Sequence, residues 1–144
     1  MKEYALSLAE ILALDIELNG QVDQATGTVR FKGLLNQSLP LIAKYWLTKL
    51  AKTVGEEKSK IETIKNDLIK KYGVEEEGNV VIKQYLDEES KQPNPNFKVY
   101  LDEFGSLLRE TITIQYTPIK LSLLSSIETN ETYAIAYNFV DDTQ

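Results

Sequence analysis

The segment from Ser38 to Tyr72 constrains the fold most, because it has the start, the body and the stop of one long helix. Ser38 is a suitable N-cap, Pro40 falls in the first turn, and Gly73 follows the last helical residue. Apolar residues recur at spacings of mostly three or four and predict a single stripe along this helix. The stripe consists of Leu39, Ile42, Trp46, Leu50, Val54, Ile61, Ile64, Leu68 and Tyr72.

A helix of this length is difficult to enclose in a chain of 144 residues. At about 1.5 Å per residue the helix is about 52 Å long, whereas a compact domain of this size is roughly 37 Å across. Either the helix kinks or breaks near Gly55, a weak helix former, or one end projects and exposes apolar side chains. We expect self-association or docking onto a larger assembly, through Trp46, Leu50, Ile61, Ile64 and Leu68.

Shorter elements flank the long helix. Ser7 and Glu10 match a capping box, which predicts a helix over residues 8–18 that ends at Asn19-Gly20. A second short helix is expected over 97–109, and a last helix from Thr129 or Asn130 to about Phe139. Strands are expected at residues 28–31, 80–86, 111–116 and 119–124, with a further strand considered near residues 2–6.

The remaining segments, 74–79 and 87–96, have the composition of surface loops, and two prolines in the second argue against regular pairing there. The order of elements predicts an α+β fold with a single domain over residues 1–144. In this fold, one long helix (about 38–72) and shorter helices pack on a small antiparallel sheet. That sheet is expected to contain the strands at 80–86, 111–116 and 119–124.

The absence of cysteine and histidine removes most catalytic chemistry. Thiolate nucleophiles, imidazole bases and zinc sites of the usual kinds are excluded. Acidic residues occur in runs at 75–77, 87–89 and 102–103, and their spacing resembles neither a calcium loop nor a catalytic motif. No glycine-rich phosphate loop is present. We therefore expect no enzyme activity, no metal and no cofactor.

Charge is distributed unevenly along the chain, whose net charge is -6. Eight lysines and four acids between residues 39 and 72 give a net +4, whereas nine acids and four bases between residues 73 and 110 give a net -5. These two regions are complementary, within one chain or between copies. Lys44, Tyr45, Trp46, Lys49 and Lys52 combine cations and aromatic rings as single-strand nucleic-acid surfaces do. The overall acidity argues against nucleic acid as a partner.

The N-terminal residues lack the basic and apolar regions of a signal peptide, and no apolar run approaches the roughly 18 residues that cross a bilayer. We therefore expect no membrane association.

Several features follow one another in the order found in a group of short tailed-bacteriophage proteins of unknown function. They are Leu39-Pro40, the long lysine-glutamate helix, Lys71-Tyr72-Gly73, an acidic loop ending in Gly78-Asn79, Asn94 to Phe97, a leucine-bearing helix and Thr111 to Ile114. The chain resembles this group over residues about 38–125. The resemblance implies a virion or assembly component in the host cytoplasm or the virion, whose partners are itself or other phage proteins. The alternative is a phage-encoded inhibitor or a factor that binds a host protein.

Overall fold

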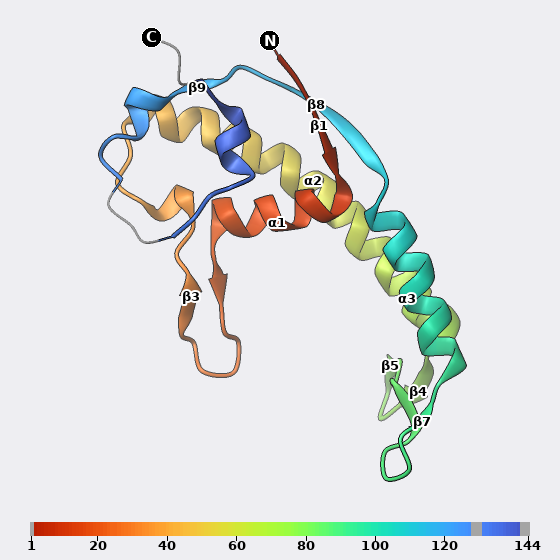
Figure 1. The fold of residues 1–144 in the computed structure, drawn as a ribbon. Coiled ribbons are helices and arrows are strands. Elements are labelled where there is room, and N and C mark those ends of the chain that lie inside the picture. The colour runs from red at the N-terminus through yellow and green to blue at the C-terminus, as the bar shows by residue number, and fades with distance from the viewer. Residues whose placement is uncertain (1, 128–130, 142–144) are drawn as a thin grey trace. The chain divides into compact units, whose positions relative to one another are not determined.

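The computed structural model describes residues 2–127 and 131–141, and its class is α+β as predicted. Figure 1 shows the helices and strands of the chain. The chain divides into two compact units. Unit 1 consists of Met1–Lys58 and Thr111–Gln144, and unit 2 consists of Ser59–Glu110. Among the described residues, no helix combines the length and the apolar character that a membrane crossing requires.

Unit 1 is built around a pair of strands that lie far apart in the sequence. Strand β1 (Lys2–Ser7) pairs antiparallel with β8 (Thr111–Tyr116) over six residues, from Lys2 opposite Tyr116 to Ser7 opposite Thr111. Side chains point alternately to the two faces of each strand, and those of Leu6, Ile114 and Tyr116 are buried. The strands predicted near 2–6 and at 111–116 are therefore confirmed.

Helix α1 (Leu8–Asn19) follows β1 directly and begins at the predicted capping box. The Ser7 hydroxyl accepts from the Glu10 N–H at 3.1 Å, and the Glu10 carboxylate accepts from the Ser7 N–H at 3.0 Å. Ile11, Leu14 and Leu18 are fully buried. The helix ends at Gly20, whose φ of 86° is in the region that favours glycine.

A hairpin of β2 (Gln21–Val22) and β3 (Val29–Phe31) follows, and β3 confirms the strand predicted at 28–31. A 3-10 helix η1 (Leu34–Asn36) then leads toward α2.

Helix α2 (Leu41–Tyr72) begins three residues later than predicted and contains 32 residues. It is helical through Gly55, so the predicted alternative of a break there is wrong. Its buried residues in unit 1 are Ala43, Leu47, Leu50 and Val54.

Leu50, Val54 and Ile61 of the predicted stripe are buried, but in the first turns of the helix Ala43 and Leu47 are buried in place of the predicted Ile42 and Trp46. Trp46 is only half-buried and Ile42 is 50% exposed. Six residues between positions 41 and 47 are apolar, so several sides of this part of the helix could face the core. Packing against the rest of unit 1 determines which side does.

The end of unit 1 differs most from the prediction. The segment 119–124 is not a strand that pairs with 111–116. Its first two residues form β9 (Ile119–Lys120), which pairs in parallel with β10 (Val140–Asp141), and the rest forms the 3-10 helix η2 (Leu121–Leu124). The expected last helix is a single 3-10 turn, η3 (Ala136–Phe139), and its expected caps, Thr129 and Asn130, lie outside the described residues.

Unit 2 contains helix α3 (Pro95–Leu108), which begins two residues before the predicted 97. Asn94 is its N-cap and accepts from the Asn96 N–H at 3.1 Å, and Pro95 takes the first helical position. Tyr100 is the buried residue of this helix.

Two hairpins replace the strand expected at 80–86 and the loops expected at 74–79 and 87–96. The first pairs β4 (Val74–Glu76) with β5 (Asn79–Val81), and the second pairs β6 (Tyr85–Asp87) with β7 (Gln92–Pro93). Positive φ at both Glu77 (51°) and Gly78 (84°) gives the first hairpin a tight turn whose twist suits paired strands. The described strands form five separate two-stranded sheets, so 80–86, 111–116 and 119–124 share no common sheet.

Candidate functional site

The five residues predicted to bind a partner do not form one exposed surface. Leu50 and Ile61 are 1% and 2% exposed, so their side chains are already buried. Trp46 and Leu68 are half-buried, and Ile64 is the exposed member at 42%. Trp46 and Leu50 belong to unit 1, whereas the other three belong to unit 2.

A different side of α2 exposes apolar residues in unit 1. Leu41 is 87% exposed, Ile42 50% and Tyr45 58%. At about 100° per residue, Leu41 and Tyr45 lie on the side of the helix roughly opposite to the buried Leu50. Lys44, Lys49 and Lys52 are exposed beside them, and no acidic residue lies between positions 41 and 52. We call Leu41, Ile42, Lys44, Tyr45, Lys49 and Lys52 the basic-apolar surface.

Trp46 lies at the edge of this surface and connects it to the core. Its ring contacts Tyr45 and Tyr116 edge-on, with ring centres 5.3 and 6.0 Å away, and the Lys49 ammonium lies 5.2 Å from its ring centre. The Tyr116 hydroxyl donates to the Trp46 carbonyl. Burial, together with Tyr4, raises the pKa of Tyr116 far above its ordinary value. The aromatic residues that suggested a nucleic-acid surface are thus partly engaged in packing.

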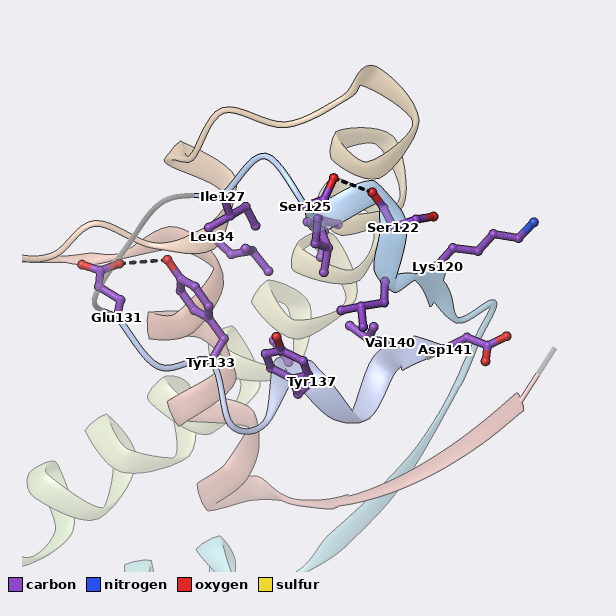
Figure 2. Close-up of a pocket in the computed structure, with 14 residues that line it drawn as sticks. Leu34, Lys120, Ser122, Ser125, Ile127, Glu131, Tyr133, Tyr137, Val140 and Asp141 are labelled. Carbon is purple, nitrogen blue, oxygen red and sulfur yellow. Dashed lines mark hydrogen bonds between the residues drawn. The ribbon is translucent and has the colours of Figure 1, made fainter. Parts of the chain in front are cut away.

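Unit 1 also contains a pocket of about 730 Å³ with mainly aliphatic walls (Figure 2). Its walls come from η1, α2, η2 and the C-terminal segment. They include Leu34, Leu47, Leu121, Leu124, Ile127 and Val140. Lys120 and Asp141, from the paired strands β9 and β10, lie at one side of it (Figure 2). A pocket of this size and composition is suited to apolar groups.

Glu131 and Tyr133 contribute polar groups to another part of this pocket's wall (Figure 2). The Glu131 carboxylate accepts from the backbone N–H groups of Lys32 and Gly33 and from the Tyr133 hydroxyl at 3.1 Å. Desolvation raises the pKa of Glu131, but these hydrogen bonds outweigh it and the pKa is lowered overall. Gln37 donates to the Tyr133 hydroxyl at 2.9 Å. These hydrogen bonds connect the C-terminal segment to the chain before α2. The partners are nearly a hundred residues apart, so no local sequence pattern predicts the contact.

A second carboxylate also connects distant segments of unit 1 through hydrogen bonds. Glu17 of α1, 8% exposed, accepts from the N–H groups of Ile135 at 3.0 Å and Ala136 at 3.2 Å. Asp15, two residues before Glu17 and also buried, accepts from Asn19 at 2.9 Å and from Lys58 at 3.0 Å. These acids hold unit 1 together, and we assign them no catalytic role.

The acidic runs noted in the sequence lie on exposed parts of unit 2. Glu76 pairs with Lys83 at 2.9 Å, and Glu103 accepts from the Tyr72 hydroxyl at 2.8 Å. Within the part of the chain that the structure describes, no group of three or more acidic side chains is arranged to hold a metal ion.

The two hairpins of unit 2, the end of α2 and the start of α3 line an open hollow of about 270 Å³. Val74 and Leu86 line it and are nevertheless 58% and 61% exposed. None of its lining residues is acidic, but six exposed acids follow Val74 and Leu86 along the chain. They are Glu75, Glu76, Glu77, Asp87, Glu88 and Glu89, and residues 74–90 contain one lysine. We call this hollow and its acids the acidic hairpin surface.

No protein-family model, curated protein or solved structure matches this chain. The class that the fold and the surfaces define is an α+β protein with exposed apolar and charged faces.

Proposed function

We propose that the chain is a non-enzymatic component of a bacteriophage particle or of its assembly, and that it acts through protein–protein contacts. Its site of action would be the host cytoplasm or the virion. The observation that carries the proposal is the basic-apolar surface of unit 1, where Leu41, Ile42 and Tyr45 are all at least half exposed within about one helical turn. Clustered exposed apolar residues with charges around them are typical of protein interaction sites.

The order of sequence features shared with tailed-bacteriophage proteins supports the viral part of this proposal. The absence of histidine and cysteine supports its non-enzymatic part, because such a chain has few groups for acid-base or nucleophilic catalysis.

The test is quantitative mass spectrometry of purified phage particles from the culture that produces the protein. We expect the protein in many copies per particle. Its absence from particles, together with specific co-purification of one host protein, would favour the alternative of a host-binding inhibitor and contradict the proposal.

A pair of variants links the test to the surface. Leu41→Asp with Tyr45→Asp places two carboxylates in the basic-apolar surface and is expected to reduce incorporation into particles. Gln24→Asp with Val29→Asp is the matched control, because these residues of the β2–β3 hairpin are also exposed, belong to the same unit and do not pair with each other. The control is expected to be incorporated normally.

A further inference from the structure

We infer that the partner of the basic-apolar surface is the acidic hairpin surface of a second copy of this chain. The inference rests on the proposed function and names one of its contacts. Both surfaces combine exposed apolar side chains with charge, and the charges are opposite. Residues 41–52 carry three lysines and no acid, whereas residues 74–90 carry six acids and one lysine.

The apolar parts of the two surfaces are compatible in size. Leu41 is 87% exposed in the first turn of α2, and Tyr45 follows it one turn later. The hollow between the hairpins has about 270 Å³, and Tyr72, Val74, Val81, Tyr85 and Leu86 contribute to its walls. Because a cavity of about 150 Å³ already holds a benzene ring, this hollow has room for one large apolar side chain.

The hairpins themselves favour such a contact. Each has only two strands, and a two-stranded hairpin is marginally stable without further packing. Covering Val74 and Leu86 would remove apolar area from water and stabilise both hairpins. The Lys83 ammonium at the hollow pairs with Glu76 at 2.9 Å, and the Lys91 and Lys71 ammonium groups lie 5.1 and 5.0 Å from the ring centres of Tyr85 and Tyr72. The other five acids still outnumber these cations and can attract lysines of a second copy.

The contact joins two different surfaces, so each copy that uses its basic-apolar surface still offers its acidic hairpin surface. Such head-to-tail contacts continue into rings or open filaments. This property suits a component that acts by copy number in an assembly.

The first measurement is the mass of the purified full-length chain, by light scattering coupled to size exclusion over a range of concentrations. We expect species heavier than the 16.4 kDa monomer, which grow with protein concentration and shrink as salt is raised. A strict monomer in every condition would overturn the inference.

Charge reversal on either surface is expected to weaken association by about tenfold or more. The first variant is Lys44→Glu with Lys52→Glu, which leaves residues 41–52 with a net charge of -1. The second is Glu75→Lys with Glu77→Lys and Glu89→Lys, which gives residues 74–90 a net charge of +1. Lys49 and Glu76 are left unchanged because each already has a partner within the chain. The matched control, Lys70→Glu with Lys98→Glu, changes the net charge as the first variant does but lies outside both surfaces, and it is expected to associate like the wild type.

Mixing the two charge-reversed variants gives the decisive result. Alone, each presents two surfaces of the same sign, whereas an equimolar mixture again pairs opposite signs. We expect the heavy species to return only in the mixture. If the mixture stays monomeric while both variants retain the wild-type circular dichroism spectrum, the proposed pairing is wrong.

Leu41→Asp tests the apolar part independently and is expected to weaken association, whereas Val29→Asp is expected to leave it unchanged. Unaltered association of Leu41→Asp would exclude insertion of this residue into the hollow. The inference and the proposed function can be contradicted independently. If the protein is monomeric but abundant in particles, only this inference is wrong. If it self-associates but is absent from particles, only the proposed function is wrong.

Discussion

Individual carboxylates connect segments of unit 1 that are distant in sequence. Glu17 on α1 and Glu131 in the C-terminal segment both accept hydrogen bonds from backbone N–H groups, at Ile135 and Ala136 and at Lys32 and Gly33. A carboxylate that accepts such bonds satisfies donors that would otherwise be desolvated without a partner. These residues therefore determine where the C-terminal segment, and with it the pocket of Figure 2, is placed.

Replacing Glu131 by glutamine should lower stability in a pH-dependent way. The hydrogen bonds to the ionised carboxylate lower the pKa of Glu131 below its ordinary value of 4.5, against the effect of desolvation. The ionised form is thus preferred in the folded state, and its stabilising contribution is present above the ordinary pKa and is lost as pH falls through the folded pKa. We expect the difference in unfolding free energy between wild type and Glu131→Gln to be largest near neutral pH and to shrink below about pH 4.5.

Urea denaturation at several pH values measures this difference. Glu110→Gln, at an exposed position, is the control and should follow the wild type throughout. A difference that stays constant down to pH 3 would mean that ionisation of Glu131 does not contribute.

Trp46 is the single tryptophan, so its fluorescence reports on the edge of the basic-apolar surface. Its half-buried ring contacts Tyr45 and Tyr116, so we expect emission at shorter wavelength than that of free tryptophan. Trp46→Ala should destabilise unit 1 by about 2 kcal/mol, less than the 3–5 kcal/mol typical of fully buried large aromatic residues. The exposed Tyr45→Ala should cost less than about 1 kcal/mol. Emission like that of free tryptophan, without loss of stability, would contradict this packing.

At the scale of elements, the sequence predicts those structures that local chemistry determines. The capping box of Ser7 and Glu10, the stop at Gly20 and the alternation in 111–116 all act within a few residues, and the structure confirms them. The segments 119–124 and 80–86 have strand-like composition, but their pairing depends on distant or irregular partners. Ile119 pairs with Val140, and a proline, Pro93, takes part in the hairpin with Tyr85. Composition alone contains no information on such pairings.

The long helix allows a direct test of its continuity. Gly55 lies inside α2, and a methyl group added there would meet no atom within 4 Å. We therefore expect Gly55→Ala to stabilise the protein by about 0.5–1 kcal/mol, because alanine loses less backbone entropy in a helix than glycine does.

Gly33→Ala is the contrasting substitution. Its φ is 88° and an added Cβ would lie 2.4 Å from the Gly20 nitrogen, so it should destabilise strongly. Thermal unfolding followed by circular dichroism compares the two. Destabilisation by Gly55→Ala would indicate that the helix bends at this residue and needs glycine there.

At the scale of the whole molecule, the sequence predicts the fold class and the charged regions better than it predicts the site. The α+β class follows from helix signals and short β-rich runs, and both charged regions are visible in the sequence. The sequence predicts partner-binding residues on the apolar stripe of α2, yet Leu50 and Ile61 of that stripe are buried. The exposed large apolar residues of α2 are Leu41, Ile42, Tyr45 and, of the five predicted, Ile64. Which side of a broadly apolar helix faces inward is decided by packing, and the sequence of the helix does not contain that information.

The division into two units makes a last prediction. The strand pair β1–β8, helix α1 and its hydrogen bonds to the C-terminal segment all lie within unit 1, which is formed by the two ends of the chain. A chain in which residues 59–110 are replaced by a flexible glycine-serine linker of about 12 residues should therefore keep the fold of unit 1. Trp46 remains in that chain, so its emission wavelength, the dispersion of amide signals in NMR spectra and a cooperative thermal transition measure the outcome. Loss of all three would show that unit 1 requires unit 2 in order to fold. Retention of all three, with loss of concentration-dependent association, is the result expected if the acidic hairpin surface provides the contact between copies.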